Sequence, residues 1–268
     1  MRVRGLLLDV EGVLVGDKRY IAVETAVDFI RQVRAAGCPF RLISNNTTDD
    51  RGTMITKLTR AGFDFRPEEL HTCTSAAIAR LRVSGVRRCL VLGNMTLRRI
   101  FAEAGFAVVD DRDVDAVIVG LDTDLTYQRL QMACDAVISR KATLLALHHN
   151  RRYDDVAGRP APSVGALVAA IEYATQTEAV VIGKPSPAYF REALGDLAVP
   201  AGDVLIVSDD PLSDLAGAKR MGMRAAFVRS GKYRDDSVLA EIPAAQRPDL
   251  VTDRIGDLLT HGRLVLEP

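Results

Sequence analysis

Three features are scarce or missing in this sequence, and each absence excludes a class of protein. Its 268 residues carry 35 basic and 35 acidic side chains, so no net charge favours nucleic acid or an anionic membrane surface. No apolar run approaches the roughly 18–20 residues that cross a bilayer. The N-terminal apolar run at 6–8 is too short for a signal peptide and is followed at once by Asp9. We therefore expect a cytoplasmic protein that binds neither nucleic acid nor membrane.

Cysteine is the third scarce feature. The four cysteines are widely scattered and form no C-x-x-C pair, which argues against a thiolate metal site or a redox motif. Short internal repeats and low-complexity segments are absent as well. The chain is nevertheless long enough for one large or two medium domains with proper cores.

Short apolar runs alternate with helical patterns from one end of the chain to the other. Strands are predicted over residues 3–8, 40–43, 89–92, 106–109, 116–121, 143–147, 179–182, 204–207 and 224–228. Helices are predicted over residues 22–36, 49–61, 97–104, 127–139 and 163–175. Such alternation predicts an α/β fold with parallel sheets and crossover helices. The polar segment 150–162 contains Gly158, Pro160 and Pro162 and is predicted to be a loop.

Polar residues follow four of the predicted strands at the point where each strand ends. The four segments are Asp9-Val10-Glu11-Gly12, Ser44-Asn45-Asn46, Gly183-Lys184-Pro185, and Ser208-Asp209-Asp210 with Asp214 four residues later. The carboxyl ends of strands in an open parallel sheet share one crevice, where ligands bind. We therefore expect carboxylates, a hydroxyl and a lysine to gather there.

This set of groups suits phosphoryl transfer. A phosphate ester is an anion, so its attack by a carboxylate needs charge neutralisation, which Mg²⁺ can supply through carboxylate, carbonyl and water oxygens. Asp9 and Asp209 are candidate ligands, with Asp210 and Asp214 behind them. Lys184 and the Ser44 hydroxyl can hold phosphoryl oxygens, as can amides of the glycine-bearing loop after Asp9. Asp9 can then act as the nucleophile and form an aspartyl-phosphate.

Taken singly, each of these segments has a simpler explanation. A lone acidic residue at a strand end is usually a helix cap or a turn residue. Lys184 is not a phosphate-loop lysine, because Thr177 and Pro185 break the G-x-x-x-x-G-K-[ST] frame. Only the order of the four segments and their shared position at strand ends favour a functional site.

These residues resemble the motifs of the haloacid dehalogenase superfamily of phosphohydrolases. The chain is similar in particular to subclass IIA, the NagD and p-nitrophenyl phosphatase type with a large inserted cap, and within it to the phospholysine, phosphohistidine and inorganic pyrophosphate phosphatase group. The matching segments are Ser44-Asn45-Asn46, Gly183-Lys184-Pro185-Ser186-Pro187, Asp209-Asp210 with Asp214-Leu215-Ala216-Gly217-Ala218, and Arg229-Ser230-Gly231-Lys232-Tyr233. The resemblance implies a Rossmann-like core at 1–75 and 181–268, with an α/β cap inserted at 76–180.

The resemblance also implies a role for each matching residue. Asp9 would be the nucleophile and a Mg²⁺ ligand, and Asp209 a second side-chain ligand. Glu11 would give its backbone carbonyl to the metal and its side chain to acid–base catalysis. Ser44 and the Asn45 amide would bind the phosphoryl group together with Lys184, while Asp210 and Asp214 orient Lys184 and metal-bound water. The substrate would be a small phosphorylated metabolite or a phosphoramidate or pyrophosphate bond, and related proteins often dimerise through the cap.

Two positions depart from the family pattern. Glu11 stands where an Asp is usual, so the longer side chain puts its acid–base role in doubt, whereas a contact through its backbone carbonyl would survive. Positioned acid–base catalysis is worth roughly 10²–10⁴-fold in rate. Glu11 therefore keeps open the alternative of a weakened or inactive relative that binds a phosphorylated ligand or a partner protein. Ser208 replaces a usual Gly, which we expect to matter less.

Two further interpretations have less support. His148, His149 and Arg151 follow a predicted cap strand and could contact substrate, but a solvated loop explains them equally well. Adjacent histidines on a strand point in different directions and make poor joint metal ligands. A signalling receiver also needs acids, a hydroxyl and a lysine at strand ends, but it would be about half this length.

Overall fold

A computed structural model describes residues 1–16, 20–155 and 157–268. The chain divides into two compact units. The first unit comprises Met1–Ser44, Arg51–His71 and Lys184–Pro268, and the second comprises Asn45–Asp50 and Thr72–Gly183. Both contain parallel sheets with helices, which confirms the predicted α/β fold class. The assignment of 76–180 as a cap and of its flanks as a catalytic core stays a prediction.

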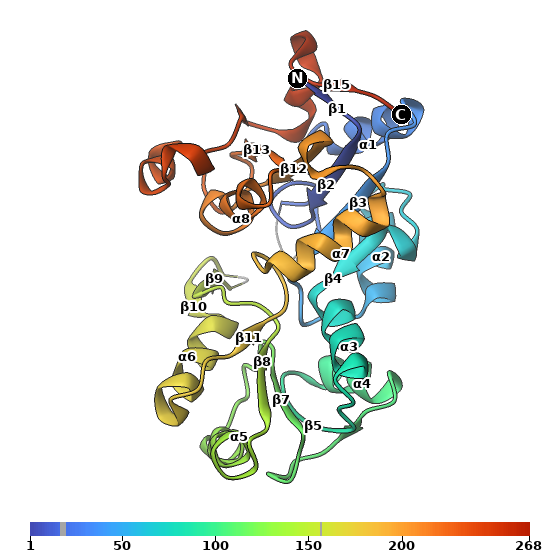
Figure 1. Cartoon of the computed structure of the whole chain (residues 1–268). Coiled ribbons are helices and arrows are strands. Elements are labelled where there is room, and N and C mark those ends of the chain that lie inside the picture. The colour runs from blue at the N-terminus through green and yellow to red at the C-terminus, as the bar shows by residue number, and fades with distance from the viewer. Residues whose placement is uncertain (17–19, 156) are drawn as a thin grey trace. The chain divides into compact units, whose positions relative to one another are not determined.

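A six-stranded sheet forms the centre of the first unit (Figure 1). Its order is β14 (Leu250–Thr252), β13 (Arg224–Val228), β12 (Val204–Ser208), β2 (Gly5–Asp9), β3 (Phe40–Ser44) and β4 (Leu70–Thr72). The pairings from β14 through β3 are all parallel. A separate parallel pair joins β1 (Arg2–Val3) to β15 (Val265–Leu266).

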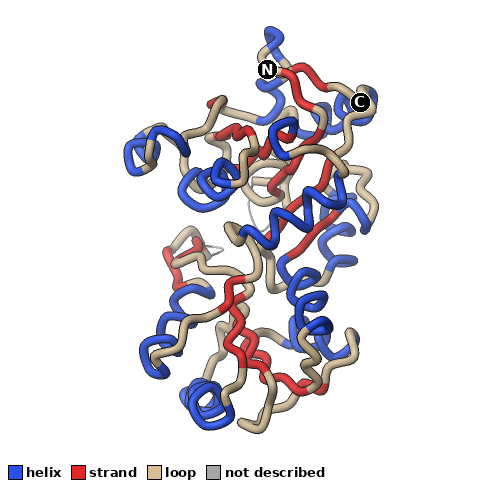
Figure 2. Tube along the Cα trace, in the orientation of Figure 1, coloured by secondary structure: helices blue, strands red, loops and turns tan. Residues whose placement is uncertain are grey.

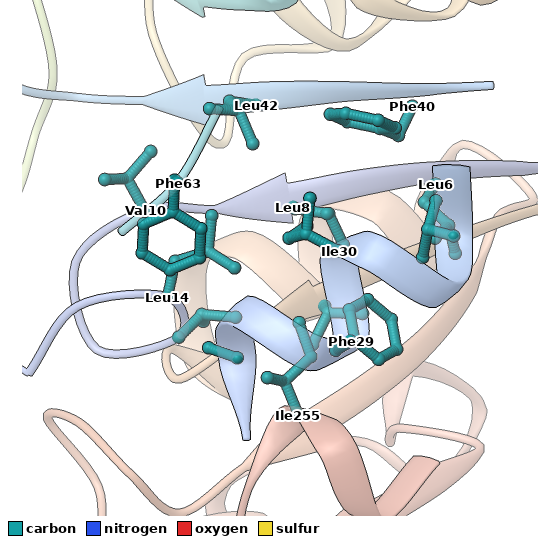
Figure 3. Packing of buried hydrophobic residues seen from close by; sticks show 14 of the residues in the cluster. Leu6, Leu8, Val10, Leu14, Phe29, Ile30, Phe40, Leu42, Phe63 and Ile255 are labelled. Atoms are coloured by element: carbon teal, nitrogen blue, oxygen red, sulfur yellow. The ribbon is translucent and has the colours of Figure 1, made fainter. Parts of the chain in front are cut away.

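The apolar run of β2 is continuous because both of its faces are buried. Leu6 and Leu8 lie on one face beside Leu205 and Val207 of β12, their register neighbours. Figure 3 shows this face packed against Phe29 and Ile30 of α1, with Phe40, Leu42 and Phe63 in the same cluster. Burying one such side chain contributes roughly 1.5–3 kcal/mol. This packing holds β2 rigidly and thereby fixes the residue that ends it.

The helices of the first unit are α1 (Ala26–Ala35), α2 (Arg51–Arg60), α7 (Pro187–Leu197) and α8 (Ala216–Arg220). Short helical turns complete it: η1 (Pro67–Glu69), η2 (Ala201–Asp203), η3 (Pro211–Leu215), η4 (Ser237–Glu241), η5 (Ala244–Gln246), η6 (Ile255–Leu258) and η7 (Thr260–Gly262). The helix predicted from residue 22 begins only at Ala26, because Thr25 has a φ of 72° and cannot belong to a right-handed helix.

A five-stranded parallel sheet forms the second unit (Figure 2). Its order is β11 (Val180–Val181), β8 (Thr143–Ala146), β7 (Ala116–Val119), β5 (Arg88–Leu92) and β6 (Ala107–Val108). The helices are α3 (Cys73–Val83), α4 (Met95–Glu103), α5 (Tyr127–Arg140) and α6 (Val164–Thr175). Val117 and Val119 of β7 pack with Ala133 and Val137 of α5 and Val168 of α6 in its core.

The prediction of a loop over 150–162 is wrong at both ends of that segment. β9 (Arg152–Asp154) and β10 (Pro160–Pro162) form an antiparallel pair there. The reversal is stabilised by Asp155, which accepts hydrogen bonds from the backbone N–H of Ala157 and Arg159. The prolines are tolerated because each strand of a two-stranded pair has an edge that needs no donor.

Several elements were not predicted at all, among them α3, α7, α8 and the short edge strands β4 and β14. Within the described ranges, no helix has both the length and the apolarity needed to cross a bilayer.

Candidate active site

Three polar residues end adjacent strands of the first unit. Asp9 ends β2, Ser44 ends β3 and Ser208 ends β12. The register pairs Asp9 with Ile43 and Leu8 with Val207, so the next residues of β3 and β12 flank Asp9. All three side chains are buried at this edge of the sheet.

Lys184 lies between two carboxylates. Its Nζ is 2.8 Å from Asp9 Oδ1 and 2.7 Å from Asp214 Oδ2. Only 3% of the lysine side chain is exposed. Burial acts to lower the pKa of Lys184, but the charges of Asp214 and Asp9 outweigh it and raise the pKa above its ordinary value. Lys184 is therefore a permanent cation beside Asp9.

The Asp9 carboxylate is held by several donors. Its Oδ1 also accepts a hydrogen bond of 2.8 Å from the Val10 N–H, and its Oδ2 lies 3.2 Å from the Ser208 hydroxyl. Burial raises the pKa of Asp9, Lys184 opposes the rise, and the charge of Asp209 adds to it. Asp9 is thus fixed in orientation, and the charge of Asp209 acts on its pKa.

Ser208 connects these groups. Its hydroxyl lies 2.8 Å from Asp214 Oδ2 as well as 3.2 Å from Asp9 Oδ2, and it accepts a 3.1 Å hydrogen bond from the Asp210 N–H. The hydroxyl has one proton, so it donates to one carboxylate at a time. Asp9, Lys184, Asp214 and Ser208 therefore form a closed ring of contacts. The sequence predicted only a minor role for Ser208.

Asp209 sits against two glycines. A Cβ at Gly12, where φ is 82°, or at Gly231 would overlap with its carboxylate. Asp209 Oδ2 accepts a 2.6 Å hydrogen bond from the Lys232 N–H, and the Ser230 hydroxyl donates to the Gly12 carbonyl at 2.6 Å. The loops that carry Gly12 and Gly231 thus meet at this carboxylate.

Burial raises the pKa of Asp209 to about 7; the Lys232 N–H opposes the rise, while Asp210 and Asp214 add to it. Burial likewise raises the pKa of Asp214 to about 6, against the opposing effect of Lys184. The three carboxylates of Asp9, Asp209 and Asp214 therefore all have raised pKa values.

Asp210 contacts Lys232 and the start of η3. Its Oδ2 pairs with Lys232 Nζ at 2.7 Å, and its Oδ1 accepts a 3.0 Å hydrogen bond from the Ser213 N–H at the start of η3. Of the two acids predicted to orient Lys184, Asp214 accepts a 2.7 Å hydrogen bond from Lys184 Nζ, and the orienting roles stay predictions.

Asp9 and Asp209 form the side-chain part of a candidate metal site. In the part of the chain that is described, no three or more His, Cys, Asp and Glu side chains are arranged to hold a metal ion. Mg²⁺, however, commonly binds through one or two carboxylates and keeps several waters. Two buried carboxylates with raised pKa values, in which the charge of Asp209 adds to the rise at Asp9, fit such a cation, because its charge would offset the repulsion between them.

The remaining predicted residues have surroundings of their own. Glu11 is half-buried and forms a backbone bridge with Val15. Asn45 follows Ser44 directly but groups with the second unit. In that unit His148 is buried and its Nδ1 accepts from the Asn150 N–H at 3.3 Å, while His149 Nε2 lies 3.8 Å from Glu172. Their predicted roles stay predictions.

Comparison with known proteins identifies the family of the chain. A family model described as haloacid dehalogenase-like hydrolase matches residues 6–107, and one described as HAD-hydrolase-like matches 181–258. Phospholysine phosphohistidine inorganic pyrophosphate phosphatase from Xenopus laevis is 32% identical, over 97% of this chain and 93% of that protein.

Two solved structures have the same fold. A p-nitrophenyl phosphatase from Archaeoglobus fulgidus superimposes with a TM-score of 0.87 at 25% identity, covering 96% of this chain and 98% of that one. A glycerol phosphate phosphatase from Mycobacterium tuberculosis in complex with calcium gives 0.81 at 26%, covering 96% and 74%. The chain therefore belongs to the haloacid dehalogenase-like hydrolases, as a phosphatase of subclass IIA.

Proposed function

We propose that the protein is a Mg²⁺-dependent phosphatase that transfers the phosphoryl group of its substrate to Asp9 and then to water. The observation that carries this proposal is the fixed carboxylate of Asp9, bonded to Lys184 and the Val10 N–H and coupled by charge to Asp209. A nucleophilic carboxylate must be ionised. Lys184 favours the ionised form of Asp9 against the opposing effect of burial.

In the first step an Asp9 oxygen attacks phosphorus, the bond to the leaving oxygen or nitrogen breaks, and an aspartyl-phosphate forms. In the second step water attacks this phosphorus and releases phosphate and free Asp9. Glu11 would protonate the leaving group and later accept a proton from the water. Lys184 and Ser44 would bind phosphoryl oxygens as charge develops. Bound Mg²⁺ would supply charge neutralisation between the phosphoryl group and the carboxylates of Asp9 and Asp209.

The substrate we propose is a small phosphorylated metabolite, or a molecule with a phosphoramidate or pyrophosphate bond. The name of the Xenopus relative supports the second class, and that of the Archaeoglobus phosphatase supports aryl phosphate as a probe. The predicted homodimer stays a prediction.

The decisive experiment is a hydrolysis assay over a panel of phosphate esters, phosphoramidates and pyrophosphate, with Mg²⁺ and with EDTA. We expect turnover of p-nitrophenyl phosphate with Mg²⁺, its loss with EDTA, and its loss in Asp9→Asn. Hydroxylamine should trap the acyl phosphate in wild type and not in Asp9→Asn. Saturable binding of phosphate or an aluminium-fluoride mimic with no hydrolysis of any substrate would instead favour a binding protein that has lost turnover.

A further inference from the structure

Tyr189 is a buried tyrosine whose hydroxyl lies beside Ser44, the residue that ends β3 at the candidate active site. It occupies the third position of α7, and only 1% of it is exposed. Its ring packs edge-on against Phe190 and lies 4.6 Å from the ring of His71. Packing alone would be served equally well by phenylalanine, so the buried hydroxyl needs a separate explanation.

The hydroxyl bridges two neighbouring strands. It accepts a 3.1 Å hydrogen bond from the Ser44 N–H at the end of β3, and it lies 2.8 Å from the carbonyl of His71 in β4. The Ser44 carbonyl, at 3.3 Å, is the longer alternative acceptor. A hydroxyl is both donor and acceptor, so one oxygen can satisfy an N–H of one strand and a C=O of the next. Tyr189 thus joins β3 to β4 through its side chain.

The two bridged residues are positions where the chain leaves the first unit. Ser44 is followed by Asn45 and His71 by Thr72, both of which group with the second unit. Ser44 is therefore the last residue of its segment that contacts within the first unit can hold in place, because Asn45 groups with the second unit. Burial lowers the pKa of His71 to about 4, so its imidazole is neutral near pH 7 and adds no charge beside the Tyr189 hydroxyl.

We propose that Tyr189 is a positioning residue: its hydroxyl fixes the backbone of Ser44, so that the Ser44 hydroxyl is aimed at the phosphoryl group of the substrate. This inference rests on the proposed function, because it assigns phosphoryl binding to Ser44. It extends that function to a residue outside the strand ends, on α7. Tyr189 acts through Ser44 and does not itself touch the substrate.

The test is the isosteric variant Tyr189→Phe, compared with Tyr20→Phe, which removes a buried hydroxyl elsewhere in the first unit. We expect Tyr189→Phe to raise KM for p-nitrophenyl phosphate and the Kd for inorganic phosphate about three- to tenfold, with a smaller change in kcat, which is the scale of one lost hydrogen bond. Calorimetric titration with inorganic phosphate measures Kd without turnover. Tyr20→Phe should leave both constants unchanged.

A double-mutant cycle separates positioning from a general loss of stability. In a Ser44→Ala background, Tyr189→Phe should have little further effect on the Kd for phosphate, because the group that it positions is already gone. An equal effect in both backgrounds, or an unchanged Kd with only a lower unfolding midpoint, would overturn the inference. Phosphate binding by a wild-type protein that hydrolyses nothing would refute the proposed function alone and leave this cycle measurable.

Discussion

Gly12 and Asp209, which lie on separate strand-end loops, are in such close contact that a methyl group on Gly12 would overlap with the Asp209 carboxylate. Gly12 also has a φ of 82°, so alanine there would add backbone strain. The two effects can be separated, because Gly222 has the same φ of 82° and open space where its Cβ would lie.

We expect Gly12→Ala to displace Asp209 and to weaken Mg²⁺ binding and kcat by about tenfold or more, since a small misplacement of a catalytic group is costly. Gly222→Ala should lower stability by about 1 kcal/mol, which is the cost of the backbone conformation, and leave activity intact. Mg²⁺ titrations of activity and of the unfolding midpoint measure both effects. Equal activity of the two variants would show that the contact has no catalytic consequence.

The hydroxyl of Ser208 should matter more than its position in the motif suggests. Because it contacts carboxylate oxygens of both Asp9 and Asp214, Ser208→Ala removes a hydrogen bond to a charged group, worth about 1.5–3 kcal/mol. We expect kcat to fall about tenfold or more with little change in KM. Ser208→Gly should have a similar effect. Ser213→Ala is the matched control, because Ser213 contacts Asp210 through its backbone N–H. Wild-type kcat in Ser208→Ala would refute this role.

Glu11 gives the clearest test of acid–base geometry. Its reference pKa of about 4.3 is close to the 3.9 of aspartate, so replacing it by aspartate changes reach more than acidity. We expect Glu11→Asp to raise kcat for p-nitrophenyl phosphate by about tenfold, within the range of positioned acid–base catalysis. Glu11→Gln should lower kcat, since it keeps the length and removes the proton transfer. Turnover in Glu11→Asp that stays at or below wild type would show that the longer side chain is already well placed.

Mg²⁺ should stabilise the protein more at high pH than at low pH. In the folded state burial raises the pKa of Asp209 to about 7 and that of Asp214 to about 6, against about 3.9 in an unfolded chain. Between about pH 4 and 7 the folded state therefore binds more protons, so the free energy of unfolding of the metal-free protein falls as pH rises through this window.

Mg²⁺ needs deprotonated ligands, and its binding reverses this loss. Unfolding midpoints with EDTA and with Mg²⁺ at pH 5 and pH 8 check the prediction. We expect a larger Mg²⁺-induced increase at pH 8. An equal increase at both values would mean that Asp209 is not a ligand.

Sequence predicted the layout of the site better than its contacts. Mainly apolar strands ending in Asp9, Ser44 and Ser208 predict a parallel sheet and the edge at which a site would lie, because strand direction determines where the carboxyl ends meet. The closed ring through Ser208 could not be predicted, since it depends on the register of β12 against β2. The sequence offered one signal, namely that Asp9 and Ser208 each come directly after the apolar run of their strand. In the structure Val207 pairs with Leu8, which sets Ser208 beside Asp9.

Other differences arise from long-range packing. The segment Asn45–Asp50 groups with the second unit, where Thr47 Oγ1 accepts from the Leu121 N–H and Asn94 Nδ2 donates to the Thr48 carbonyl. No local pattern indicates these partners, which are 74 and 46 residues away in sequence. Tyr189 was missed for the same reason: its partners Ser44 and His71 precede it by 145 and 118 residues.

The pairing of β2 with β12 also determines the order in which this protein can assemble during synthesis. Their ends, Asp9 and Ser208, are separated by 199 residues, so the central pair of the first sheet cannot close until the ribosome has passed β12. The strands of the second sheet all lie within the continuous stretch Thr72–Gly183 and emerge earlier. Closing shorter loops costs less chain entropy. The stretch Thr72–Gly183 can therefore fold first, and β2 pairs with β12 only after β12 has been synthesised.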